Sequence, residues 1–355
     1  MGYGPYCEIG GENRTAAAER GARAAAARRA RPAQLAAWAG AALWVGVALL
    51  WGGGAAAAAG GAARGGVRAR SVAVVASGGL RTFAHCNASV FDLLIKRNPR
   101  YTFDFYVYAV TAGPAPNRAG AAAHKAAIAG EEAALAALQA GAHPRLRRLA
   151  AISTSDARRT VLADVPGLAD LPHGNGTARG KAVNVASMFR SMQVADALRT
   201  ADEAARGFVH AVVVRIRPDL RLCAAVDLSA AERVIAQHAD TVLVPFATER
   251  LVGDQFAIAS AQAMVKYAKG FDALIRRGRL GERKALYPEH ELWRHLAQQH
   301  LSSVALPAFR ASLVRQDARH RPLLEDAYGK LRADFPALEG IGALPPATLC
   351  GAALL

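Results

Sequence analysis

Two arginines and one aspartate follow an apolar run in the middle of this chain, in the order Arg215-Ile216-Arg217-Pro218-Asp219. The β-branched residues before them, Val212–Val214, predict a strand buried on both faces. The carboxyl ends of such strands are where parallel sheets bind ligands. Two guanidinium groups beside one carboxylate suit an anionic substrate, with or without a metal ion. For this segment alone, a solvated turn in which Arg and Asp pair is an equally good interpretation.

A glycine turn follows an earlier apolar run, Val72–Ala76, and has the sequence SGGLRT. The backbone N–H groups of Gly78 and Gly79 would lie at a helix N-terminus, where a phosphate can bind. Arg81 would add a charge-assisted contact to a diphosphate. The turn lacks both the dinucleotide fingerprint and the GxxxxGK[ST] pattern, so by itself it indicates only a tight turn that needs glycine.

Two further carboxylates lie downstream. Asp254 stands between a predicted strand and an apolar patch, where a carboxylate can bind or deprotonate a sugar hydroxyl. A turn or cap aspartate is the ordinary alternative. Glu289 follows Pro288 at a predicted helix start and is a candidate general base, although a first-turn acid often only complements the helix dipole. The nearby histidines lack the HExxH spacing, so no zinc site is predicted.

Alternating strands and helices must position these residues, which predicts an α/β fold with one mainly parallel sheet flanked by helices. The alanine-rich residues 113–150 could form a helix around Glu131–Gln139 or an inserted, poorly ordered loop. Residues 170–180 have the composition of a flexible loop. The expected strands are Val72–Ala76, Phe103–Val110, Val209–Ile216 and Thr241–Pro245, and the expected helices are Phe83–Lys96, Val183–Ala204, Ala230–Gln237, Ala261–Ile275 and one that begins at Pro288.

Composition limits the classes of function. The chain has 355 residues and a formal net charge of +16, from 44 basic and 28 acidic residues. The arginines are scattered, without a zinc finger, a basic helix arm or an RNA-binding aromatic signature, so nucleic acid is not expected as a partner. The cysteines Cys7, Cys86, Cys223 and Cys350 form no CxxC pair. This argues against a zinc site and a disulfide-dense scaffold, and it allows one or two disulfides in an oxidising compartment.

The amino-terminal residues predict a membrane anchor, with a basic cytosolic tail (1–32), a transmembrane signal anchor (33–55) and a flexible stem (56–70). Its most apolar part, Leu35–Trp51, would span about 26 Å as a helix, and the following Gly and Ala residues can extend it. Arginines are denser before the segment, which predicts a single-pass type II protein of the Golgi or endoplasmic reticulum membrane. An organelle transit peptide and a cleaved signal peptide are the alternatives.

Two glycosylation triplets, which begin at Asn87 and Asn175, lie after the apolar segment and favour a lumenal domain, although such triplets also arise by chance. The globular domain is expected over residues 71–330, with divergent or poorly ordered insertions within 113–180. A C-terminal tail, 331–355, would follow it.

Three blocks of the chain, in this order, resemble a family of glycosyltransferase-like proteins. They are VAVVASGGLRTF with DFYVY, then VVVRIRPDL, then GDQFAIAS with PEHEL. The family includes uncharacterised plant and algal proteins and bacterial lipopolysaccharide-synthesis proteins, and the resemblance covers residues 71 to about 305. It implies a GT-A-like, nucleotide-sugar-binding α/β domain that moves a sugar from its donor to a hydroxyl of a glycan or glycoconjugate.

The resemblance also implies roles for the residues above. Gly78, Gly79 and Arg81 would lie by the donor nucleotide, Arg217 and Asp219 at its diphosphate, and Asp254 and Glu289 near the acceptor. The chain departs from metal-dependent transferases in having no Asp-x-Asp triplet. Either Asp219 holds Mn²⁺ or Mg²⁺ with water and phosphate ligands, or Arg215 and Arg217 neutralise the diphosphate without a metal.

Two other functions are compatible with this sequence. One is a catalytically silent lumenal protein that keeps the fold and binds glycans, which the missing Asp-x-Asp makes credible. The other is an organelle-imported nucleotide-binding enzyme from which residues 1–70 are removed as a transit peptide.

Overall fold

The structure is a computed structural model that describes residues 70–80, 82–112, 121–139, 145–165, 168, 178–277, 287–306, 309–316 and 322–326. The chain divides into two compact units, Met1–Gly66 and Val67–Leu355, and every described residue belongs to the second. The predicted anchor (33–55) and the C-terminal tail (331–355) lie outside the described residues. Among the helices that are described, none has the length and apolarity to cross a membrane.

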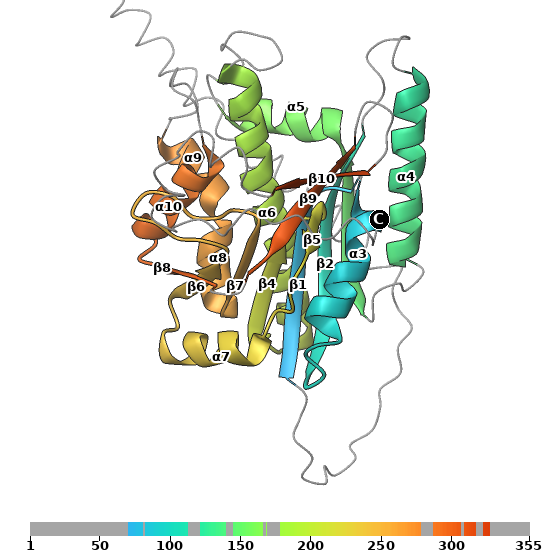
Figure 1. Cartoon of the computed structure of the whole chain (residues 1–355). Coiled ribbons are helices and arrows are strands. Elements are labelled where there is room, and N and C mark those ends of the chain that lie inside the picture. The colour runs from blue at the N-terminus through green and yellow to red at the C-terminus, as the bar shows by residue number, and fades with distance from the viewer. Residues whose placement is uncertain are drawn as a thin grey trace, which may run out of the picture. The chain divides into compact units, whose positions relative to one another are not determined.

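A seven-stranded sheet forms the centre of the second unit, in the order β3-β2-β1-β4-β7-β6-β8 (Figure 1). The first four strands of this order are parallel, and β7 runs antiparallel to its neighbours β4 and β6. The predicted α/β class is confirmed, with a sheet that is mixed and mostly parallel. The strands are β1 (Arg70–Gly79), β2 (Tyr101–Thr111), β3 (Leu146–Ser153), β4 (Val212–Ile216), β6 (Thr241–Val244), β7 (Phe256–Ala259) and β8 (Ser302–Ala305).

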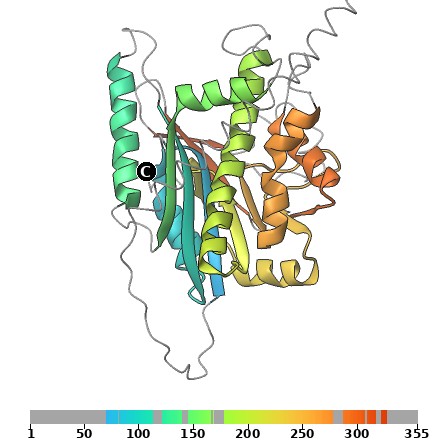
Figure 2. The same ribbon diagram turned by 180° about the vertical axis from the view of Figure 1, so that it is seen from behind.

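Helices cover both faces of the sheet. One face carries α3 (Phe83–Val90), the π-helix Phe91–Ile95, α4 (Ala121–Gln139) and α7 (Leu228–Gln237), and the other carries α5 (Thr154–Asp164), α6 (Ala178–Arg206), α8 (Ala261–Ala268), α9 (Gly270–Arg277) and α10 (Pro288–Gln298). Figure 2 shows α6 lying across the face that is turned away in Figure 1. Side chains alternate along each strand, so β4 contributes to both cores. Val212 and Val214 belong to the core under α3 and α7, whereas Val213 belongs to the core under α6, α8 and α10. By this alternation Arg215 shares the α6 face.

A second, antiparallel sheet was not expected from the sequence. It consists of β5 (Leu220–Leu222), β9 (Ala311–Gln316) and β10 (Pro322–Asp326), in the order β10-β9-β5. Strand β5 begins directly after Asp219, and the Val314 N–H donates to the Asp219 carbonyl over 2.9 Å. The second sheet therefore fixes the turn that carries Arg217 and Asp219.

The alanine-rich region contains regular structure. Helix α4 extends the predicted helix toward its N-terminus, to Ala121, and β3 pairs with β2 in parallel. The sequence gives little sign of β3, because this strand lies at the edge of the sheet and most of its residues are half-buried. Without strong alternation between apolar and polar residues, such a strand has no clear period.

The helix predicted over Ala261–Ile275 is two helices, α8 and α9, which meet at Lys269–Gly270. A Cβ at Gly270 would lie 2.4 Å from Cδ1 of Phe189 on α6. Glycine at this position therefore allows α9 to pack closely on α6.

The Gly270→Ala variant is expected to lower the free energy of unfolding by about 1–3 kcal/mol, because the added methyl must displace a buried ring. Chemical denaturation of the full-length protein measures this loss. Gly130→Ala in α4 is the matched control, since no atom lies within 4 Å of its Cβ position and alanine favours a helix. An equal effect of the two substitutions would contradict the close packing of α9 on α6.

Candidate functional site

The two turns singled out in the sequence meet at one edge of the sheet. Strand β1 has β2 on one side and β4 on the other, so the strand order reverses between β1 and β4. Ligands of α/β sheets bind beyond the carboxyl ends of the strands at such a switch point. A Cβ at Gly78 would lie 3.4 Å from Cδ of Pro218, which places the glycine turn in contact with the Arg217–Asp219 turn.

The expected glycine turn lies later than the sequence indicated, because Gly78 and Gly79 are the last residues of β1 and pair with Ala109 and Val110 of β2. Gly78 has a backbone φ angle of +134°, which residues other than glycine rarely adopt. Arg81 lies outside the described residues. The hydroxyls of Ser77 and Thr82 flank the turn, are buried, and have no hydrogen-bond partner among the described residues. These hydroxyls were not recognised in the sequence, and they are polar groups that a bound ligand could satisfy.

Arg217 and Asp219 pair with each other. Nε of Arg217 donates to Oδ1 of Asp219 over 2.9 Å, and Nη2 donates to Oδ2 over 2.8 Å. The aspartate is buried, whereas 23% of the arginine side chain is exposed at the sheet edge. The bidentate pair holds the guanidinium in a fixed orientation.

This pairing does not fit a divalent cation at Asp219, because the cation would have to displace Arg217 from both carboxylate oxygens. Within the described part of the chain, no group of three or more His, Cys, Asp or Glu residues could hold a metal ion. A metal at Asp219 stays a prediction, and the sugar transfer proposed for these residues uses no metal.

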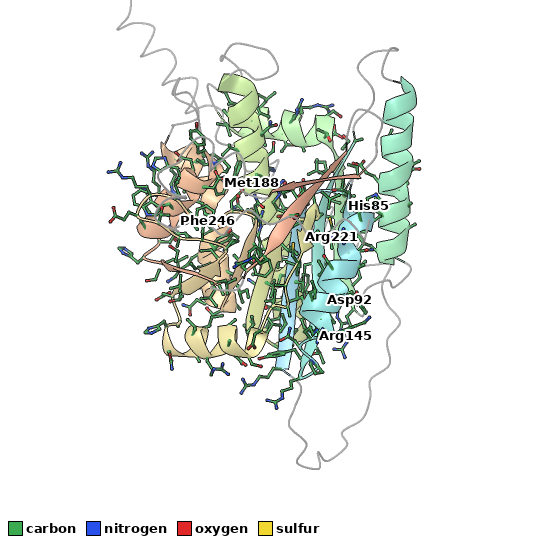
Figure 3. All side chains as sticks on the ribbon, viewed as in Figure 1. His85, Asp92, Arg145, Met188, Arg221 and Phe246 are labelled. Atoms are coloured by element: carbon green, nitrogen blue, oxygen red, sulfur yellow. The ribbon has the colours of Figure 1, made fainter. Side chains whose placement is uncertain are left out.

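Asp254 lies in the loop between β6 and β7 and is 1% exposed. The Gly253 N–H donates to the Phe246 carbonyl over 3.0 Å, and a Cβ at Gly253 would lie 3.1 Å from Cδ1 of Phe246. Glycine therefore lets this loop close against Phe246. Figure 3 shows Phe246 and Met188 toward the end of the sheet where β1 and β4 finish, with Arg145, just before β3, at the other end.

Hydrogen bonds connect the Asp254 loop to the other predicted site residues. The Arg217 N–H donates to the Gln255 carbonyl over 3.2 Å, and Nη1 of Arg215 donates to the Asp254 carbonyl. The Val252 N–H donates to the Glu289 carbonyl over 3.1 Å, which places the first turn of α10 beside the same loop. The structure thus brings together the candidates from β4, the Asp254 loop and α10.

Arg215 is as deeply buried as Asp254, with 1% of the residue exposed. Burial lowers the pKa of its guanidinium, and the charge of Arg217 lowers it further, while Tyr267 and Asp254 oppose the shift. Burial also raises the pKa of Tyr267 on α8 to about 12. Tyr267 therefore belongs to the cluster, although the sequence indicated only an amphipathic helix there.

Comparison with known proteins gives similarities to solved structures. No protein-family model matches the chain, and no curated protein matches it. Among solved structures, it is similar to the apo crystal structure of mouse xyloside xylosyltransferase 1, with 9% sequence identity and a TM-score of 0.36, over 67% of this chain and 84% of that chain. What the site can do is therefore decided by the geometry of its own residues.

Proposed function

We propose that the chain is a glycosyltransferase that moves a sugar from a nucleotide-sugar donor to a hydroxyl of a glycan or glycoconjugate. The observation that carries this proposal is the contact between the Gly78 turn and the Arg217 turn at the β1–β4 switch point. The N-terminus of α3, which follows the end of β1, can supply N–H groups for a phosphate, and an edge arginine supplies positive charge. This combination suits the diphosphate of a nucleotide-sugar.

The proposed reaction transfers the sugar from one oxygen to another. The acceptor hydroxyl loses its proton to Asp254 or Glu289, and its oxygen forms a bond to the anomeric carbon. The bond from that carbon to the diphosphate breaks, and the electron pair leaves with the phosphate oxygen. Arg217, oriented by Asp219, stabilises the charge that develops there.

The same fold without catalysis is the second candidate, and a specific observation favours it. The chain has no Asp-x-Asp triplet, and Asp219 is engaged by Arg217 through both carboxylate oxygens. Both facts are compatible with a transferase that needs no metal and with a protein that only binds glycans.

Release of nucleoside diphosphate distinguishes these candidates. The full-length protein is incubated with UDP-sugars and GDP-sugars, with and without Mn²⁺ and with glycan acceptors, and free UDP and GDP are measured. We expect turnover that does not require Mn²⁺. Binding of the nucleotide-sugars without turnover would favour the silent protein, and the absence of both binding and turnover would refute nucleotide-sugar chemistry.

We also propose that the domain lies in the lumen of the Golgi or endoplasmic reticulum, behind the anchor predicted at residues 33–55. Cys223 is disulfide-bonded. Disulfides persist mainly in oxidising compartments, which supports the lumenal location.

Glycosylation tests this location. Asn87 lies on α3 and is half-buried, and Asn175 lies outside the described residues. The protein from cells with a secretory pathway is expected to lose mass on glycosidase treatment, and the double variant Asn87→Gln, Asn175→Gln should show no such loss. A full-length wild-type protein without glycans would count against the lumenal location, and loss of residues 1–70 would favour the transit peptide.

A further inference from the structure

Arg215 has two side-chain donors, Nε and Nη2, that no acceptor within the described part of the chain satisfies. These two N–H groups lie along one edge of the planar guanidinium and point in the same direction. They form a fork that matches a pair of oxygens. The same two atoms of Arg217 hold both carboxylate oxygens of Asp219. Arg215 therefore carries the fork that Arg217 uses, two residues further into the strand and fully buried.

Tyr267 is the second group with an unsatisfied donor here. It lies on α8 at 0% exposure, and its hydroxyl has no hydrogen-bond partner among the residues that the structure describes. Helix α8 packs against strand β4, which brings Tyr267 near Arg215, and each of the two groups changes the pKa of the other. By strand alternation Arg215 faces the same core, under α6 and α8, to which Tyr267 belongs.

These unsatisfied donors are costly to the protein alone. A buried donor without an acceptor costs about 1–3 kcal/mol, and more when it is charged. Phenylalanine would fill the space of Tyr267 without that cost. Buried donors without an acceptor are therefore expected mainly where a bound ligand supplies the acceptor.

We propose that Arg215 and Tyr267 together bind one oxyanion, a phosphate or a carboxylate, through the Nε and Nη2 fork and the phenol hydroxyl. The inference deepens the proposed function and rests on it for the source of the oxyanion. That source is either the diphosphate of the donor or the carboxylate of an acidic sugar. Because Nη1 of Arg215 also holds the Asp254 carbonyl, the bound oxyanion positions the loop that carries the candidate base.

Tyr267→Phe is the variant that tests this site, and Tyr106→Phe is its matched control. Both tyrosines are 0% exposed, but the Tyr106 hydroxyl donates to Oδ2 of Asp202 over 2.8 Å. We expect Tyr267→Phe to keep or raise the Tm and to weaken oxyanion binding about tenfold, as loss of one charge-assisted hydrogen bond does. Tyr106→Phe should lower the Tm and leave binding unchanged.

Isothermal titration of the full-length variants identifies the oxyanion. The probes are UDP, GDP, UDP-glucose, UDP-glucuronate, inorganic pyrophosphate and glucuronate. A phosphate at Arg215 predicts an equal loss of affinity for UDP and UDP-glucose in Tyr267→Phe, whereas a carboxylate predicts a loss for UDP-glucuronate and glucuronate only.

Three results separate this inference from the proposed function. If Tyr267→Phe binds every probe as tightly as wild type, or loses as much Tm as Tyr106→Phe, the oxyanion site is refuted while the transferase is not. If wild type binds pyrophosphate or glucuronate through Tyr267 but no nucleotide, the oxyanion site stands and the transferase fails. If wild type binds none of the probes, both are refuted.

Discussion

The Asp254→Asn protein is expected to transfer sugar about 10²–10⁴-fold more slowly than wild type, because the amide cannot accept the proton of the acceptor hydroxyl. Asparagine has nearly the same shape as aspartate, and the main-chain carbonyl that receives Nη1 of Arg215 is unchanged. The loss should therefore appear in kcat with little change in donor KM. Steady-state transfer assays with the full-length protein measure both.

Glu289→Gln is the matched comparison for Asp254→Asn. Both carboxylates belong to the same loop cluster, but Asp254 is 1% exposed and Glu289 is only half-buried. A base shielded from water keeps the acceptor proton from exchanging with solvent, which favours Asp254. If Asp254→Asn retains full transfer and Glu289→Gln loses it, the base is Glu289. If both variants are fully active, neither carboxylate is the base.

The central strands could be predicted from the sequence because their burial is complete. Strands β1 and β4 are enclosed between helices, so each contains a buried, valine-rich apolar run, Val72–Ala76 in β1 and Val212–Val214 in β4. Strand β5 has three residues, too few to show a period, and it exists because β9 pairs with it from about 90 residues away. The antiparallel orientation of β7 is likewise decided by pairing, because a short apolar run such as FAIA does not indicate whether a strand is parallel or antiparallel to its neighbours.

The site could be predicted in its edge residues but not in its interior. The family resemblance implied that Gly78, Arg217 and Asp254 surround one donor and acceptor site. In the structure the Gly78 and Arg217 segments are in contact and the Arg217 N–H bonds to the Asp254 loop, whereas the roles of these residues stay predictions. Which partner Arg217 takes depends on the turn geometry, and both alternatives suited the sequence. Tyr267 occupies an apolar-face position of an amphipathic helix, where a tyrosine is usually core. The signal that could have identified Tyr267 is a phenol hydroxyl at a helix position expected to be buried.

A second cluster of charges lies at the other end of the sheet, away from the candidate site. His210, just before β4, is 2% exposed, with Nδ1 2.7 Å from Oε1 of Glu203 and Nε2 3.3 Å from Oδ2 of Asp104. Burial alone would lower the pKa of His210, but the hydrogen bonds to Asp104 and Glu203 outweigh it and raise the pKa. The other charges around it are Asp202, Arg206 and Arg199 from α6 and Arg147 and Arg148 from β3, and the fully buried Arg199 pairs with both Glu203 and Asp196.

The full-length protein is expected to lose stability as the pH rises from about 6.5, the ordinary histidine value, through the raised pKa of His210 in the folded state. A raised folded-state pKa contributes its full stabilisation below the unfolded value and loses it above the folded value. Asp104 and Glu203, whose pKa values are lowered in the folded state, act in the opposite direction and lose their contribution in acid. Stability should therefore be greatest in the mildly acidic range between these limits.

His210→Gln is expected to lower the free energy of unfolding by about 1–3 kcal/mol in that mildly acidic range, because it removes the imidazolium that hydrogen-bonds to two buried carboxylates. Arg147 and Arg206 still pair with Asp104 in this variant, and Arg199 still pairs with Glu203, which keeps the loss moderate. As the pH rises above neutrality the wild-type protein also loses the imidazolium, so the gap between the two proteins should narrow. Denaturation curves from pH 5 to pH 9 measure it, with exposed His238→Gln as the control. A gap that stays constant with pH would show that His210 is neutral in the folded protein and only fills space.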